Sequence, residues 1–218
     1  EDLMPEGKEL GLKPEADPGI RLAVKPGVTL IEAGANLGFP AAANLGIAEA
    51  LADPACRYVG LLNDDAWLGD GWLAAILPLA GGHPEGAGFQ GMTLDARDPS
   101  VVDSVGLTIG HAGRAIQLGY RSRQLAAGTG EVFGVNAAAA LYRRAFLEAQ
   151  PFGGEVLDAG FGMYLEDVDL AARSVLLGWR NYVVEGAVAY HLGSGGDRER
   201  RPATVRLNSR NEVLVAVK

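Results

Sequence analysis

The chain has 218 residues, of which 48% are hydrophobic and 21% are charged, a length and composition that fit one α/β domain with a sizeable core. Its formal net charge of −8 disfavours nucleic acid as a partner, because a phosphate backbone would be repelled over most of the surface. Cys56 is the only cysteine, so a disulfide within the chain is excluded and a cytoplasmic location is expected.

Membrane-spanning and secretory segments are not predicted. No apolar run approaches the roughly 18 to 20 residues that cross a bilayer, and the chain does not open with the pattern of a signal peptide. Membrane contact is therefore expected to be peripheral, at the inner face of the membrane, and a homo-oligomer is compatible with the sequence.

The first part of the chain combines a polar segment with a strand and a helix. Residues 1–19 are rich in charge, proline and glycine and are predicted to form a flexible segment, so that the folded domain covers residues 20–218. The apolar run at 28–31 predicts a short buried strand, and residues 38–51 predict a helix that begins near Pro40.

Three polar residues end the second apolar run. Residues 58–62 predict a buried strand, and Asn63, Asp64 and Asp65 follow it directly, before a helical pattern at 72–79. In open α/β sheets, ligands bind beyond the carboxyl ends of the strands. Carboxylates at that place can coordinate Mg²⁺ or Mn²⁺ and leave positions open for a diphosphate. The same residues also fit an ordinary polar turn that ends a strand.

The rest of the chain predicts further strands, a loop and a short helix. Strands are expected at 86–94 and 101–109, a loop at 114–130, a short helix at 143–149, and a strand at 181–190 that ends in His191. An imidazole near two carboxylates can complete a metal site, although a histidine at a strand end is more often a plain hydrogen-bonding residue.

The most regular pattern predicts an amphipathic helix from Leu165 or Glu166 to Gly178. Its apolar residues follow the i, i+3, i+4, i+7, i+8 spacing and are expected to face the core. They are Val168, Ala171, Ala172, Val175 and Leu176.

Acidic residues fill the first turn of this helix. The helix macrodipole favours Glu166, Asp167 and Asp169 there by about 0.3 to 1 kcal/mol each, which is a purely structural explanation for any of them. Asp169 also lies four residues before Arg173, the spacing of an ion pair, whereas Asp167 has no such partner. Asp167 is therefore the better candidate for catalysis.

Taken in order, these motifs resemble the family 2 glycosyltransferases, in particular the rhamnosyltransferase-like bacterial members that build cell-surface polysaccharides. Residues 61–65 (LLNDD) resemble the family's L-L-N-P-D variant of the D-x-D motif, with Asp64 in place of the usual proline. Residues 163–170 (MYLEDVDL) resemble its F-x-Y-x-E-D-x-D-L signature. The other matching segments are 36–39 (NLGF), 43–47 (ANLGI), 134–136 (GVN), 141–144 (LYRR), 190–191 (YH) and 210–211 (RN).

The resemblance implies a GT-A fold, with a mixed central sheet flanked by helices. It also implies a metal-dependent, inverting transfer of a sugar from a nucleoside diphosphate sugar to a hydroxyl of a saccharide or lipid-linked saccharide. In this assignment Asp167 is the general base, Asp65 binds the divalent cation, Mg²⁺ or Mn²⁺, and His191 is a further ligand of the metal or the diphosphate.

The resemblance further implies two groups of supporting residues. The residues expected on the donor side are Asn36, Gly38, Asn44, Asn63 and Asp64. Those expected on the acceptor side or in a supporting role are Glu166, Asp169 and Asn136.

One departure from the family pattern leaves other functions open. The opening strand, helix and D-N-x-S-x-D segment that hold the donor nucleotide in the family are not found, so the transferase domain is expected to be incomplete at both ends. A non-catalytic GT-A module that binds glycan or nucleotide is one alternative. A sugar-phosphate nucleotidyltransferase is another, although the phosphate loop that it needs is not visible.

Overall fold

The structure is a computed structural model that describes residues 27–111, 113–123, 128–150, 155–193 and 202–217. The chain divides into two compact units, Glu1–Glu32 and Ala33–Lys218.

The described part of the first unit, residues 27–32, contains no helix or strand. Val28, Leu30 and Ile31 are 59%, 48% and 41% exposed, so the buried strand predicted at 28–31 is wrong. A short apolar run forms a strand only where a neighbouring strand takes up its backbone hydrogen bonds, and sequence pattern alone does not supply that neighbour. The flexible segment predicted at 1–19 lies outside the described residues.

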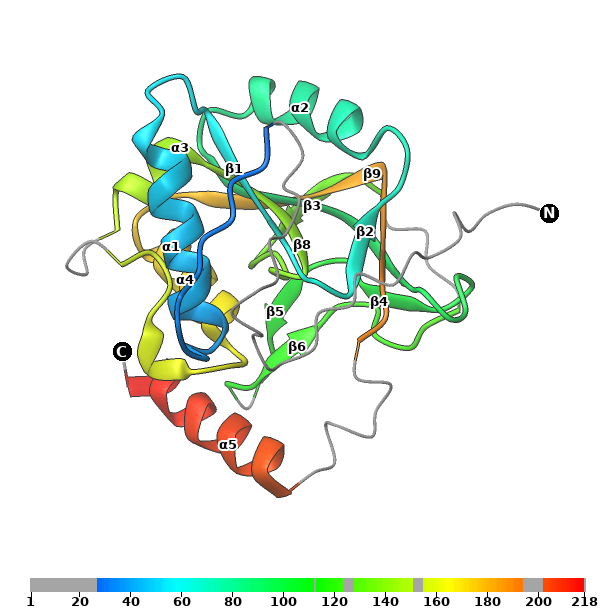
Figure 1. Cartoon of the computed structure of the whole chain (residues 1–218). Coiled ribbons are helices and arrows are strands. Elements are labelled where there is room, and N and C mark those ends of the chain that lie inside the picture. The colour runs from blue at the N-terminus through cyan, green and yellow to red at the C-terminus, as the bar shows by residue number, and fades with distance from the viewer. Residues whose placement is uncertain (1–26, 112, 124–127, 151–154, 194–201, 218) are drawn as a thin grey trace. The chain divides into compact units, whose positions relative to one another are not determined.

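The second unit contains a seven-stranded mixed sheet (Figure 1). Strands β3 and β9 are parallel, and the other neighbours in the sheet are antiparallel. Across the sheet the order is β1 (Tyr58–Leu62), β8 (Ala139–Arg143), β3 (Gly86–Asp95), β9 (Arg180–His191) and β2 (Ala66–Leu68), while β4 (Val102–Ser104) pairs with β3 and β7 (Gly130–Val132) pairs with β9. The predicted α/β architecture with a mixed central sheet is therefore confirmed.

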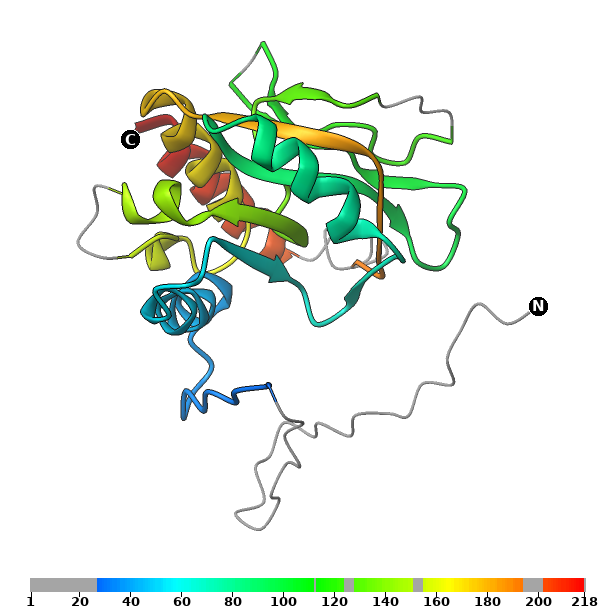
Figure 2. The same ribbon diagram turned by 90° about the horizontal axis from the view of Figure 1, so that it is seen from above.

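Helices pack on both faces of this sheet (Figures 1 and 2). Successive side chains of a strand point to opposite faces, and β8 uses both. Ala139 and Leu141 join a core with α2 (Trp72–Gly82), whereas Ala140 and Tyr142 join a core on the other face. The helices of that second core are α1 (Phe39–Ala52), α3 (Arg144–Glu148) and α4 (Glu166–Leu176).

Two predictions in the middle of the chain need correction. The strand predicted at 101–109 is interrupted at Gly106, whose φ of 117° separates β4 from β5 (Leu107–Ile109). The loop predicted at 114–130 contains β6 (Ala115–Gln117), which pairs with β5. A strand of three residues is too short to show an alternating pattern, so only its pairing reveals it. Helix α5 (Pro202–Val217) was not predicted.

The buried face of α4 also differs from the prediction. Val168 and Ala171 are buried, but Val175 and Leu176 are 49% and 80% exposed. The Asp169 and Arg173 side chains are buried in their place and form an ion pair of 2.9 Å. Burial of this pair is tolerated because Arg173 also donates to the carbonyl of Val156 at 2.7 Å and to the Gln150 side chain.

Across the described ranges, no helix combines the length and the apolar character needed to cross a membrane.

The contact of α2 with the sheet gives a direct test of the fold. Ile76 is fully buried on α2, whereas Leu73 on the same helix is 47% exposed. Truncation of a buried isoleucine removes apolar contacts and leaves a cavity, so Ile76→Ala should lower the free energy of unfolding by about 2 to 5 kcal/mol. Leu73→Ala is the matched control, with an expected loss below about 1 kcal/mol. Urea denaturation measures both, and equal losses would contradict this packing.

Candidate functional site

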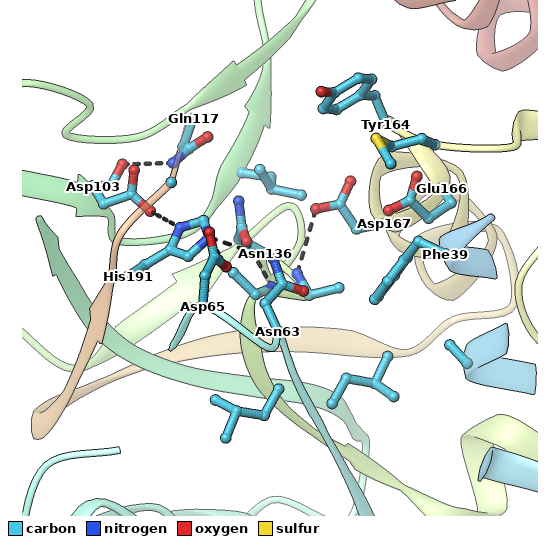
Figure 3. A pocket seen from close by; sticks show the side chains of 18 of the residues that line it. Phe39, Asn63, Asp65, Asp103, Gln117, Asn136, Tyr164, Glu166, Asp167 and His191 are labelled. Atoms are coloured by element: carbon cyan, nitrogen blue, oxygen red, sulfur yellow. Dashed lines mark hydrogen bonds and ion pairs between the residues drawn. The ribbon is translucent and has the colours of Figure 1, made fainter. Parts of the chain in front are cut away.

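The carboxyl ends of β1, β3 and β9 lie at one edge of the sheet, because β1 and β3 both pair antiparallel with β8 and β9 is parallel to β3. A cleft of about 1030 Å³ opens at this edge (Figure 3). The structure thus brings together residues that are far apart in sequence. The predicted site residues that line the cleft are Asn63, Asp64, Asp65, Asn136, Glu166, Asp167 and His191.

On one side of the cleft, His191 lies between two carboxylates. Its Nε2 is 3.1 Å from Asp65 Oδ1, and its Nδ1 is 2.9 Å from Asp103 Oδ2. Strand β2 folds back directly after Asp65 and pairs Ala66 with His191, which explains why the aspartate and the histidine meet. Gln117 Nε2 donates to the backbone carbonyl of Asp103 at 2.6 Å and ties the β5–β6 hairpin to the same group.

The two carboxylates determine the charge of His191. Burial disfavours the imidazolium and lowers the pKa of His191, but the hydrogen bond and charge of Asp103 and the charge and hydrogen bond of Asp65 oppose this effect. The net result is a pKa above the ordinary histidine value. His191 therefore stays protonated, and keeps its ion pairs with Asp65 and Asp103, to a higher pH than a histidine with the ordinary pKa would.

On the other side of the cleft, the segment 136–138 positions Asp167. The Asp167 carboxylate accepts hydrogen bonds from the Val168 N–H at 2.8 Å and from the Ala137 N–H at 3.4 Å. The same segment receives a hydrogen bond at its Ala138 carbonyl from the Asn63 N–H at 2.9 Å. Asp167 and the residues that follow β1 are thus attached to one short stretch of backbone.

The Asn136 side chain supports this stretch. Its Oδ1 accepts from the Ala138 N–H at 2.8 Å, and the Asn136 backbone N–H donates to Oε1 of the fully buried Gln90 at 2.6 Å. Asn136 therefore shapes the floor of the cleft.

Glu166 and Asp167 form a pair of neighbouring carboxyls with unequal surroundings. Burial raises the pKa of both groups, and the charge of Asp167 raises that of Glu166 further, to about 8. The Asp167 carboxylate has backbone N–H donors that favour its ionised form, whereas Glu166 Oε2 has no hydrogen-bond partner among the described residues. The first proton that the pair binds as the pH falls is therefore held by Glu166, while the N–H donors of Asp167 act against the effect of burial on that carboxyl.

Three residues expected on the donor side do not line the cleft. Asn36 Oδ1 accepts from the Gly38 N–H at 3.0 Å. Gly38 has φ of 77°, and a Cβ at this position would lie 2.5 Å from the Gly162 carbonyl oxygen. Asn44 Nδ2 donates to the Leu157 carbonyl at 2.7 Å, and Asn44 Oδ1 accepts from the Leu157 N–H at 2.9 Å. These contacts make the three residues structural supports of the wall around Phe39, which does line the cleft.

Asp169 lies outside the cleft as well, in its buried ion pair with Arg173. Asp103 is a cleft residue that sequence reasoning missed. It lies in a strand of three residues, 88 positions away from its partner His191, so no local pattern marks it.

A divalent cation would find two protein ligands in this cleft. Within the described residues, no group of three or more His, Cys, Asp or Glu side chains is arranged to hold a metal. The neutral form of His191 could nevertheless offer Nε2, which pairs with Asp65 in the absence of a metal, as a nitrogen ligand beside the Asp65 carboxylate, so that metal binding would release a proton. Asp103 at Nδ1 supplies the carboxylate contact that orients metal-binding histidines. The donor set suits Mg²⁺ or Mn²⁺ if phosphate oxygens and water complete the coordination.

Comparison with known proteins adds the following findings. The model of the family described as "Glycosyl transferase family 2" matches residues 20–149, which is more than half of the chain. Among solved structures, the chain is similar to "Crystal Structure of A197 from STIV", with a TM-score of 0.44 and 14% sequence identity. The match covers 70% of this chain and 66% of that one, just under two thirds of its length. A search of curated proteins found no match.

The protonation of Glu166 predicts how stability depends on pH. Its pKa is about 8 in the folded protein and near the ordinary 4.5 when unfolded, so the folded state binds the proton more tightly. The contribution of Glu166 to the free energy of unfolding is therefore greatest below pH 4.5 and falls as the pH rises through 8. Between pH 5 and pH 8, we expect the free energy of unfolding of the wild type to fall by at least about 1.4 kcal/mol more than that of Glu166→Gln.

Urea denaturation at the two pH values measures this difference. Glu185→Gln, at an exposed position, is the control, and its free energy of unfolding should change between the two pH values by the same amount as that of the wild type. An equal change for wild type and Glu166→Gln would contradict the prediction, because it would mean that Glu166 is already ionised in the folded protein between pH 5 and pH 8.

Proposed function

The chain belongs to glycosyl transferase family 2, and on that premise we propose that it transfers a sugar from a nucleoside diphosphate sugar to an acceptor hydroxyl with inversion at the sugar. One observation carries the proposal: the Asp167 carboxylate lines the same cleft as Asp65, which is more than 100 positions away in sequence, and as His191, the partner of Asp65. The mixed α/β sheet with flanking helices is that of a GT-A fold.

In the proposed reaction Asp167 is the general base. An alcohol is a weak nucleophile, so a carboxylate that accepts its proton in the transition state accelerates transfer by about 10² to 10⁴. Burial raises the pKa of Asp167, which strengthens the group as a proton acceptor, while the Ala137 and Val168 N–H groups oppose this effect and favour the ionised carboxylate. Glu166 holds its proton beside it and adds no second negative charge to the acceptor side.

The opposite side of the cleft would receive the diphosphate. A divalent cation, when bound, would neutralise the negative charge that develops on the departing diphosphate. Asp65 and His191 would hold that ion, Asp103 would orient the imidazole, and Asn63 and Asp64 would contact the donor. Base and diphosphate site then serve the two ends of an in-line displacement, which is the reason for proposing inversion.

The remaining parts of the proposal concern substrates and place. The acceptor is a saccharide or lipid-linked saccharide, and Asn136 and Glu166 shape its side of the cleft. Asn36, Gly38 and Asn44 support the wall around Phe39, on the donor side of the cleft, through their hydrogen bonds. Asp169 supports α4 through its ion pair with Arg173. We place the reaction in cell-surface polysaccharide synthesis of the rhamnosyltransferase-like kind, in the cytoplasm.

A non-catalytic module would differ from this enzyme in one respect. It would bind nucleotide or glycan without any requirement for a proton acceptor. In this chain the Glu166–Asp167 pair supplies such an acceptor, because Glu166 holds the first proton and Asp167 can take up the next. Turnover, rather than binding alone, therefore separates the two functions.

The role of Asp167 is tested by Asp167→Asn in the full chain, with a panel of uridine, thymidine and guanosine diphosphate sugars. The substitution preserves shape and removes the proton acceptor, so the rate of sugar transfer to the acceptor, followed as nucleoside diphosphate release, should fall by about 10² to 10⁴. Affinity for the diphosphate, measured by calorimetry, should stay within about twofold, since the other side of the cleft is unchanged. Wild-type turnover in Asp167→Asn would remove Asp167 as the base.

The diphosphate side is tested by calorimetric titration of uridine, thymidine and guanosine diphosphates with and without Mn²⁺. Loss of a carboxylate that orients a metal-binding histidine costs about 10- to 100-fold in affinity, so Asp103→Asn should weaken Mn²⁺-dependent binding by that factor. Asp65→Asn should weaken it at least as much. Asp70→Asn, an exposed aspartate outside the cleft, is the control. Binding that is insensitive to Asp65 and to Mn²⁺ would contradict the assignment.

A further inference from the structure

The segment that leads into α4 has an unusual backbone. Tyr164 and Leu165 are consecutive residues with φ of 72° and 66°, and neither is glycine. Leu165 is the residue before the first turn of α4, and no side chain caps the helix there. Residues with side chains adopt this left-handed conformation only when their surroundings impose it. The cause must therefore lie outside the segment.

Helix α5 supplies a large part of that support. Asn211 is fully buried, and its Nδ2 donates to the carbonyls of Phe161, Met163 and Tyr164 at 3.1, 2.8 and 2.7 Å. The two N–H groups are shared among three acceptors, with the longest contact at Phe161. Asn211 is thus bound to the backbone on both sides of the turn.

Arg210 extends the same contact. Its Nη2 donates to the carbonyls of Gly160 and Phe161 at 2.9 and 2.7 Å. It also donates to Asn211 Oδ1 at 2.7 Å, and Nε donates to the same oxygen at 2.9 Å, which orients the amide so that its N–H groups face the turn. The two neighbouring side chains act as one unit.

The remaining carbonyl of the segment is bound from α1. The Phe39 N–H donates to the Gly162 carbonyl at 3.2 Å. All five carbonyls from residue 160 to residue 164 therefore accept hydrogen bonds from α1 or α5. Without those donors the carbonyls would have to turn toward water, and no hydrogen bond from α1 or α5 would hold residues 164 and 165 in the left-handed conformation.

The turn is connected directly to Asp167. The Leu165 carbonyl accepts the Asp169 N–H at 3.0 Å, the first hydrogen bond of α4, and Asp167 lies within that first turn. Rotation at Leu165 would move this turn of the helix and separate the Asp167 carboxylate from the Ala137 N–H. The position of the carboxylate therefore depends on the conformation at residues 164 and 165.

We infer that Arg210 and Asn211 are positioning residues for Asp167: they hold the left-handed turn at 164–165 and so place the carboxylate at the cleft. This assignment rests on the proposed function for the role of Asp167, but the placement itself has a readout that needs no activity. The Ala137 N–H is bound to Asp167, so its hydrogen exchange reports whether the carboxylate is in place.

The test is residue-resolved amide hydrogen exchange on the full chain. Arg210→Ala removes an exposed side chain and should leave the fold intact, while Asn211→Ala removes the buried amide. In both variants, exchange at Ala137 should rise by about 10-fold, toward the value set by Asp167→Ala, which has no acceptor, while amides of β3 and β8 change by less than about twofold. Ser209→Ala, at an exposed position of α5, is the control and should change nothing.

Two outcomes would overturn the inference. Unchanged exchange at Ala137 in Arg210→Ala would show that Asp167 keeps its place without the contact. An equal rise at Ala137, β3 and β8 would show a contribution to general stability only. If the inference holds, turnover of Arg210→Ala should fall by about 10-fold with the donor KM within about twofold. Unchanged turnover despite faster exchange would also overturn it, whereas failure of the proposed function would appear as absent transfer in wild type with the exchange result intact.

Discussion

The backbone of residues 136–138 is the constraint on which the site depends. This short segment before β8 accepts the Asn63 N–H at Ala138, donates to Asp167 from Ala137, and donates to Gln90 from Asn136. The strand end that carries the acidic residues and the helix that carries Asp167 are therefore both hydrogen-bonded to this one segment.

Electrostatics divides the cleft into two regions. On the α4 side, burial and like charge favour one proton on the Glu166–Asp167 pair, so a single carboxylate remains available to accept a proton. On the side of β9, His191 is held between Asp65 and Asp103. In the proposed reaction, a divalent cation would reverse the local sign of charge, so that an acidic protein could bind a phosphorylated donor here. The net charge of −8 and a diphosphate substrate are therefore compatible.

The sequence predicted those parts of the structure that local patterns determine. Strands β1 and β9 and helix α4 were predicted because each combines a clear apolar period with a polar end, and their polar ends form the cleft. The exposed run at 28–31, the strand β6 and the buried face of α4 depend on which segments pair or pack, and composition does not contain that information. Asp103 and the Arg210–Asn211 contact act over long sequence separations, so only the folded chain reveals them.

The proposed function requires a single cleft that serves both the diphosphate and the base. Paramagnetic relaxation by Mn²⁺ bound with a nucleoside diphosphate measures this directly, because broadening of amide signals falls steeply with distance from the ion. We expect the Leu192 amide, which is bound to the Asp65 carbonyl, to broaden together with the Ala137 and Val168 amides, which are bound to Asp167. Broadening of Leu192 with sharp Ala137 and Val168 signals, or broadening centred elsewhere on the chain, would contradict a shared catalytic site.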